Sequence, residues 1–221
     1  MLSNKMRPRS WGFEERPLIE LLISGGPVMI PIGIASVIGL AVFLERMVAL
    51  RQGAVIPPML LREVEELLRQ NRHDDAVAAA KKYPSAAARV VLTAVDAAGQ
   101  TRAHIKERLE EVGRREAAEL ERYSAVLGTV ASIAPLLGLL GTVWGMILTF
   151  EVIQSQGMGV VANLAGGISQ ALISTMAGLS VGIPALVGHR WVLARADRLI
   201  LGLEDLGAMI LDHLCPDGQA E

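Results

Sequence analysis

The sequence contains few aromatic residues and a single cysteine, and long stretches of it contain no charged residue. Aromatic residues make up 4% of the 221 residues and hydrophobic residues 52%, so the apolar content is mainly aliphatic and small. The lone Cys215 excludes a secreted scaffold held by disulfide bonds. A net charge of −2 provides no electrostatic basis for binding nucleic acid.

Three stretches without Asp, Glu, Lys or Arg are long enough to cross a membrane. They cover residues 21–44, 124–150 and 152–188, and roughly 20 apolar residues span a bilayer core. The last stretch is too long for one helix and carries four glycines between residues 154 and 167. We therefore expect a loop at 151–167 and a third span at 168–188. Three spans exclude a monomeric water-soluble enzyme.

The positions of basic residues predict the orientation of these spans. The 151–167 loop has no Lys or Arg, whereas Arg190, Arg195 and Arg198 follow the third span. Because basic residues favour the cytoplasmic side, the C-terminal segment 189–221 is predicted to be cytoplasmic. Three crossings then place residues 1–20 in the periplasm, although that segment also contains basic residues.

The segment between the first two spans, residues 45–123, is rich in charges of both signs and has helical periodicity. It is predicted to form a cytoplasmic helical domain. Its helices are expected to begin at four positions: Pro57-Pro58, Asp74-Asp75, Pro84-Ser85 and a cap at Thr101. No proline or glycine pair interrupts the last helix before the membrane, and we expect it to be long if it is continuous over about 102–150. A helix of that length requires neighbouring copies to cover it, so we expect an oligomer.

Small residues recur at helical spacing in the second and third spans. Small residues let membrane helices approach closely, and simple packing is the favoured interpretation of the glycines. Pro135 continues the stripe in the second span. The predicted packing positions are Pro135, Gly138, Gly141, Gly145, Gly178 and Gly182.

Several polar side chains in these spans need partners. A Ser or Thr hydroxyl can bond to a carbonyl of its own helix, but the larger amide of Gln170 needs water, a partner helix or a pore. Trp144 lies in mid-span, and a contact with another helix is expected there. No span contains an ionisable residue, so a titrating group for ion movement would have to come from another chain.

Two segments together resemble the paired motifs of a known family. APLLGLLGTVWGM at 134–146 and GGISQALISTMAGLSVGIPAL at 166–186 resemble the MotA/TolQ/ExbB proton-channel family, in its ExbB/TolQ branch. The likeness includes the three-span layout and Leu-Glu-Arg at 44–46, and it extends over roughly residues 20–205. Each motif alone is weak, whereas both in this order are specific. The absence of a fourth span argues against the flagellar type.

The resemblance implies an all-α homo-pentamer in the lipid of the bacterial inner membrane. It implies a ring around two copies of a single-span ExbD/TolR-type partner, whose membrane Asp carries protons. Motion of that pair would pass to a periplasm-spanning TonB/TolA-type protein for envelope transport or maintenance. Gln170 stands where some relatives have Glu, which leaves it a neutral hydrogen-bonding role. The resulting candidate pore-lining residues are Thr142, Thr149, Gln170, Ser174 and Thr175.

Other functions fit the residues less well. An intramembrane protease needs a catalytic pair within the membrane, and none is present. One Cys and scattered His residues give no zinc-ligand spacing, so neither a metal nor another cofactor is expected. The remaining alternative to a proton channel is a non-conducting oligomeric membrane scaffold.

Overall fold

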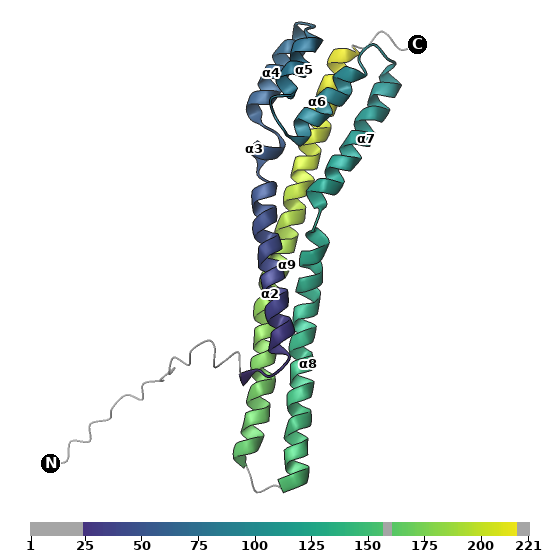
Figure 1. Ribbon diagram of the computed structural model, residues 1–221. Coiled ribbons are helices and arrows are strands. Elements are labelled where there is room, and N and C mark those ends of the chain that lie inside the picture. Colours follow the sequence, from purple (N-terminus) through teal and green to yellow (C-terminus); the bar gives the residue numbers. More distant parts are fainter. Residues whose placement is uncertain (1–23, 157–160, 216–221) are drawn as a thin grey trace, which may run out of the picture. The chain divides into compact units, whose positions relative to one another are not determined.

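The computed structural model describes residues 24–156 and 161–215, and its regular elements there are all α-helices (Figure 1). Three segments are long and apolar enough to cross a membrane: Met29–Ala49, Arg102–Gln154 and Ala165–Leu214. This confirms an all-helical fold for these residues, with three long apolar helices. The predicted periplasmic segment 1–20 lies outside the described residues. In chain order the helices are α2 Met29–Ala49, α3 Gln52–Val55, α4 Pro58–Arg69, α5 His73–Ala80, α6 Ala86–Asp96, α7 Arg102–Glu121, α8 Ser124–Gln156 and α9 Val161–Leu214.

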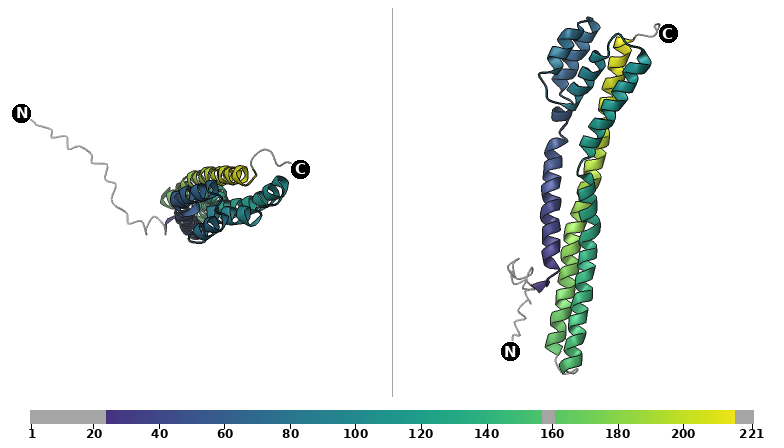
Figure 2. Two further views of the ribbon diagram at one scale, coloured as in Figure 1. Left: turned by 90° about the horizontal axis from the view of Figure 1, so that it is seen from above. Right: turned by 45° about the vertical axis from the view of Figure 1, so that its right-hand side comes forward.

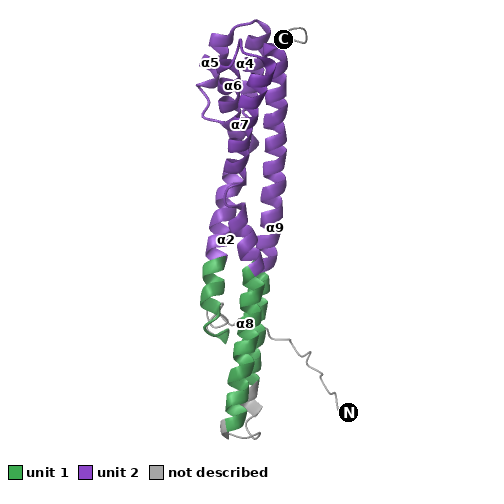
Figure 3. Ribbon diagram, turned by 90° about the vertical axis from the view of Figure 1, so that its right-hand side faces the viewer, with its two compact units in different colours: residues 1–35, 133–181 green, residues 36–132, 182–221 purple. Residues whose placement is uncertain are grey.

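The chain divides into two compact units (Figure 3). Unit 1 comprises residues 1–35 and 133–181, and unit 2 comprises residues 36–132 and 182–221. Unit 1 therefore holds the candidate pore-lining and packing residues of the second and third predicted spans, apart from Gly182. Unit 2 holds the charged helical segment between the first two spans.

The starts of three helices in unit 2 agree with their sequence signals. Pro58 is the first residue of α4, where its missing N–H costs nothing. At α6, Ser85 Oγ accepts a hydrogen bond from the Ala88 N–H at 3.2 Å. At α7, Thr101 Oγ1 accepts from the His104 N–H at 3.4 Å. The predicted cap at Thr101 is confirmed, and both hydroxyls satisfy N–H groups that a helix start leaves unpaired.

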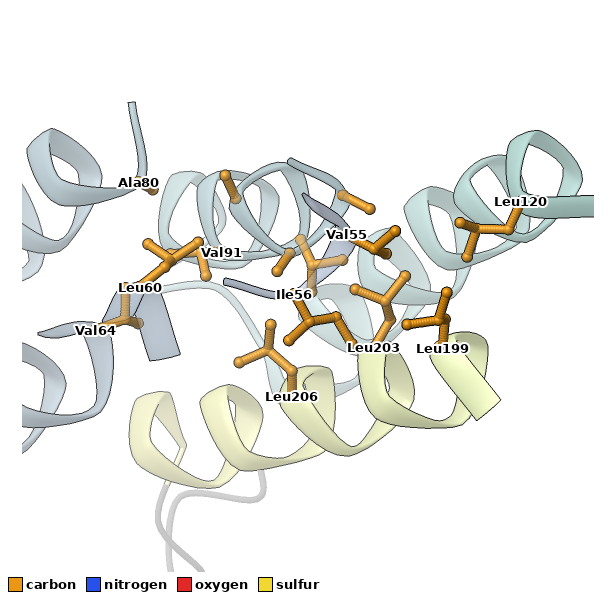
Figure 4. Close-up of a cluster of buried hydrophobic side chains, with 14 of the residues drawn as sticks. Val55, Ile56, Leu60, Val64, Ala80, Val91, Leu120, Leu199, Leu203 and Leu206 are labelled. Atoms are coloured by element: carbon orange, nitrogen blue, oxygen red, sulfur yellow. The ribbon is translucent and has the colours of Figure 1, made fainter. Parts of the chain in front are cut away.

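The core of unit 2 lies between α3, α4, α5, α6, α7 and the last part of α9 (Figure 4). Every third or fourth residue of α4 and α9 contributes to it, as expected for helices with one apolar face. Alanines on α5 and α6 allow these short helices to pack closely. Buried members include Leu60, Val64, Ala80, Val91, Leu199, Leu203 and Leu206.

Residues 102–150 do not form one continuous helix, and the expectation of a single long helix there is wrong. Helix α7 ends at Glu121, α8 begins at Ser124, and Tyr123 between them has a φ of 62°. The Tyr123 ring lies 5.4 Å from Arg46 Cζ and 4.6 Å from Arg122 Cζ. Arg46 Nη1 also donates to the Glu119 carbonyl at 3.2 Å. These two arginines favour the break through cation–π contacts and a helix C-cap.

The helices around the predicted 151–167 loop extend further than expected. Helix α8 continues to Gln156 and α9 begins at Val161, so 151–156 and 161–167 are helical rather than looped. Residues 157–160 lie outside the described part. Helix α9 then continues to Leu214, so the predicted third span and most of the C-terminal segment form one helix. Whether residues 21–44, 124–150 and 168–188 mark the membrane boundaries remains a prediction.

A partly buried ion pair joins α6 to α7 in unit 2. The Arg89 guanidinium donates to both carboxylate oxygens of Glu116, and this hydrogen bonding raises the pKa of Arg89. The Glu116 side chain is 8% exposed, whereas that of Arg89 is 53% exposed. Loss of Arg89 therefore leaves a buried carboxylate without its partner, while loss of Glu116 leaves an arginine that water can reach.

We expect Arg89→Ala to lower the free energy of unfolding by about 1–3 kcal/mol, the cost of an unsatisfied buried group. Glu116→Ala is expected to cost less, because the exposed guanidinium is hydrated. Thermal unfolding of both variants in the same detergent, followed by circular dichroism, measures the difference. A larger loss for Glu116→Ala would contradict this account of the pair.

Candidate functional site

Helices α8 and α9 lie side by side in unit 1, and their backbones come into contact (Figures 1 and 2). A Cβ added at Gly178 would lie 2.5 Å from the Ala134 carbonyl oxygen and 2.9 Å from Gly138 Cα. A Cβ at Gly145 would lie 2.8 Å from the Gly167 carbonyl oxygen. No side chain larger than hydrogen fits at these positions without moving a backbone.

Two of the candidate pore hydroxyls lie inside this helix contact. Ser174 is fully buried against Gly141 and donates to the Ala171 carbonyl at 2.8 Å. Thr149 is 5% exposed, lies against Gly167, and donates to the Gly145 carbonyl at 2.8 Å. Both hydroxyls bond to their own helix. Ser174 and Thr149 therefore fill the space that the glycines leave.

The other two threonines donate to adjacent carbonyls of α8, and both are only half-buried. Thr175 Oγ1 donates across the contact to the Gly138 carbonyl at 3.2 Å. Thr142, one turn further along α8, donates to the Leu139 carbonyl at 2.6 Å. Each hydroxyl hydrogen is thus engaged, while the oxygen keeps lone pairs that can accept a hydrogen bond.

Gln170 packs against the turn that precedes α2. Its side chain lies on Gly26, where an added Cβ would collide with the amide, and Gly26 has a φ of 74°. The Gly26 carbonyl accepts from the Met29 N–H at 3.1 Å at the start of α2. Gly26 combines a left-handed conformation with a close contact, two reasons to require glycine. Sequence reasoning missed it, although the Gly25-Gly26 pair signals a turn.

The remaining predicted positions fall into different surroundings. Pro135 lies inside α8 and is half-buried, and Gly182 is buried in α9. Trp144 is 47% exposed, so the described part of its own chain does not supply the helix contact predicted for it.

Unit 1 presents a broad apolar surface that the chain does not cover. Among its described residues only Glu151 carries a charge, and it is exposed. Such a surface requires lipid or another protein chain. Its large exposed side chains are Ile30 and Ile34 on α2, Ile133, Leu136, Leu139, Leu140, Val143, Trp144, Met146, Ile147 and Phe150 on α8, and Ile168, Leu172, Met176 and Leu179 on α9.

Within residues 24–156 and 161–215, no three His, Cys, Asp or Glu side chains lie together as a group that could hold a metal ion. The contact between α8 and α9 offers hydroxyl and carbonyl oxygens as polar groups. They can accept or donate hydrogen bonds to a group brought by another chain.

Comparison with known proteins identifies the family. The model of the MotA/TolQ/ExbB proton channel family matches residues 80–205. The chain belongs to this family. A Synechocystis sp. protein named ExbB-like 3 is 32% identical over 168 residues, which cover 75% of this chain and 80% of that protein.

Further relatives come from both named branches of the family. The Tol-Pal system protein TolQ of Pseudomonas aeruginosa is 40% identical over 86 residues, covering 39% of this chain and 37% of its own length. The biopolymer transport protein ExbB of Xanthomonas campestris is 35% identical over 107 residues, covering 45% and 42%. Together with the three apolar helices, these likenesses make the chain an ExbB/TolQ-type membrane protein. The family match includes every candidate pore residue named above.

Proposed function

We propose that this chain is the ring-forming subunit of an ExbB/TolQ-type proton channel. In this proposal Thr142 and Thr175 line the path of a proton that a partner chain carries on a membrane Asp. The supporting observation is the pair of half-buried hydroxyls, which bond to adjacent carbonyls of α8 in a unit whose only described charged residue is Glu151. Gln170, Ser174 and Thr149 would shape this path by holding α8, α9 and the start of α2 together.

The hydrogen bonds of the two threonines suggest which state of the carboxyl group they favour. Because Thr142 and Thr175 donate to carbonyls, their oxygens are ready to accept from a protonated acid. To stabilise a carboxylate, a hydroxyl must rotate and donate to it instead. The channel would therefore alternate between a protonated carboxyl group, which donates its hydrogen to a threonine oxygen, and a carboxylate, which accepts hydrogen bonds from hydroxyls that have rotated away from their helix carbonyls.

The energies involved are compatible with this cycle. An unpaired carboxylate at the centre of a bilayer costs about 2.5–3.5 kcal/mol or more. A proton that crosses 100 mV releases about 2.3 kcal/mol. A few hydrogen bonds to the carboxylate are therefore sufficient to make its free energy comparable to that of the protonated carboxyl group.

The proposal includes an oligomer, in which neighbouring copies would cover part of the apolar surface of unit 1 and lipid the rest. A pentamer in the inner membrane, with the N-terminus in the periplasm and the C-terminus in the cytoplasm, follows the family layout. The ring would enclose two single-span partners of the ExbD/TolR type. Their motion would act on a TonB/TolA-like protein across the periplasm, to energise envelope transport or maintenance.

Reconstitution tests this function directly. The chain is purified with a single-span protein encoded beside its gene, placed in liposomes under an imposed potential, and proton uptake is followed with a pH-sensitive dye. Uptake is expected only when both chains are present, and it should be lost when the partner's membrane Asp is replaced by Asn. A stable complex without proton uptake would instead identify the non-conducting scaffold.

A further inference from the structure

Unit 2 contains a groove between α7 and α9 that no described side chain fills. Its volume is about 480 Å³, and its floor is apolar, with Leu109, Leu203 and Leu211. Gly113 forms part of its wall, and a Cβ added there would meet no atom within 4 Å. The groove therefore has room for a large side chain at its middle.

Charged side chains of alternating sign border this groove. Lys106, Glu110 and Arg114 follow one another at intervals of four residues along α7, and Glu204 faces them from α9. Lys106 and Glu110 form only a long ion pair of 3.9 Å. The rim is thus able to pair with an incoming helix whose charges also alternate.

The outer face of α4 has the matching pattern. Leu60, Val64 and Leu68 point into the core, which leaves Met59, Arg62, Glu66 and Arg69 outside. Met59 is 73% exposed, the highest exposure among the large apolar side chains of the described chain. A long apolar side chain followed by a cation and an anion therefore faces away from the molecule.

The groove and the outer face of α4 lie at the same level along the axis of α9. Ile56, just before α4, lies against Gly202, and Leu109 and Val90 lie against Gly207. Since α4 begins two residues after Ile56 and rises about 1.5 Å per residue, its first turn lies level with the groove. In a closed ring, rotation about the axis keeps each residue at its height, so these surfaces can meet.

We propose that the groove of one copy receives α4 of the next copy in the ring. Helix α4 leads away from α2 and α7 leads back toward α8 (Figure 1), so the two helices run antiparallel across this interface. Met59 then enters the groove at Gly113, Arg62 pairs with Glu110, and Glu66 pairs with Lys106. This contact rests on the proposed ring and assigns its cytoplasmic interface.

Disulfide cross-linking of the full-length chain in its membrane tests the contact. Cys215→Ser removes the native thiol, and Met59→Cys with Gly113→Cys supplies a pair whose Cα atoms must come within about 7 Å to bond. Oxidation is expected to produce a ladder of oligomers on a non-reducing gel. Each single variant should stay monomeric, and a co-expressed mixture of the two should stop at dimers.

The matched control is Met59→Cys with Glu111→Cys, since Glu111 lies on the opposite face of α7 from Gly113. Equal ladders from both pairs, or none from the groove pair in a chain whose native mass shows a ring, would overturn the contact and leave the channel untouched. A monomeric wild-type chain in the membrane would overturn both proposals.

A charge exchange provides a second test that does not depend on cysteine chemistry. Glu110→Arg is expected to weaken the ring at low salt, and adding Arg62→Glu should restore it. Failure of the second substitution to restore the ring would contradict the Arg62–Glu110 pairing.

Discussion

Replacing Gly178 by alanine is expected to lower the free energy of unfolding by about 1–3 kcal/mol, the usual cost of an overpacked site. The added methyl group would lie 2.5 Å from the Ala134 carbonyl oxygen and 2.9 Å from Gly138 Cα. Both are backbone atoms, so no side chain can turn aside to make room. Helices α8 and α9 must separate, which also stretches the bond from Thr175 to Gly138.

Gly166→Ala is the matched control, because it makes the same change in the same helix where a Cβ meets no atom within 4 Å. Alanine there should be neutral or stabilise by up to about 1 kcal/mol, since glycine is the weaker helix former. Thermal unfolding of the two variants in one detergent gives the comparison. Equal midpoints would mean that the α8–α9 contact does not limit stability.

Gly145→Leu is expected from the sequence to disperse the oligomer, and the structure adds a more immediate effect. Gly145 faces Gly167 and Ala171 of its own chain, so leucine there would first separate the two helices of one subunit. The glycine pattern predicts close packing, and Gly138, Gly145 and Gly178 lie in the contact between α8 and α9. It did not distinguish contacts within a chain from contacts between chains, because both require small residues at the same spacing.

The helices of unit 2 could be predicted from local signals. Pro58, Ser85 and Thr101 are starts that neighbouring residues alone determine, because a cap bonds to an N–H two or three positions away. The break at Tyr123 has no such signal. It depends on Arg46, which approaches Tyr123 from a helix far away in the sequence, and a tyrosine with positive φ is uncommon.

The loop predicted at 151–167 was too long for a related reason. Glycines favour loops in water-exposed segments, but Gly167 lies against Thr149 in a tight helix contact. Close approach of two helices makes glycine favourable inside a helix. Sequence spacing cannot separate these two uses of glycine.

The surroundings of the candidate pore residues could not be predicted from sequence spacing either. Thr142 and Thr149 share a predicted face with Gly138 and Gly145, yet Thr149 is buried in the helix contact while Thr142 is half-buried beside it. A helix wheel assigns residues to a face but does not say what covers that face. The neighbouring helix decides which hydroxyls another chain can reach.

Replacing both Thr142 and Thr175 by valine is expected to reduce partner-dependent proton uptake by about tenfold or more. Valine keeps the shape of threonine but cannot accept or donate a hydrogen bond. A hydrogen bond to a charged group contributes about 1.5–3 kcal/mol, and about 1.4 kcal/mol corresponds to a factor of ten in rate. Liposome assays with the partner present measure the change.

Two comparisons separate conduction from folding in this double variant. Thr129→Val removes a hydroxyl that bonds to its own helix at the Ala125 carbonyl, as Thr142 does at Leu139, and it should leave uptake unchanged. Serine at 142 and 175 keeps both hydroxyls and should restore most of the uptake lost with valine. If the valine variant assembles with its partner and conducts at the wild-type rate, these hydroxyls do not meet the proton. The path must then follow polar groups outside the pair, because both threonines would have been absent while protons crossed.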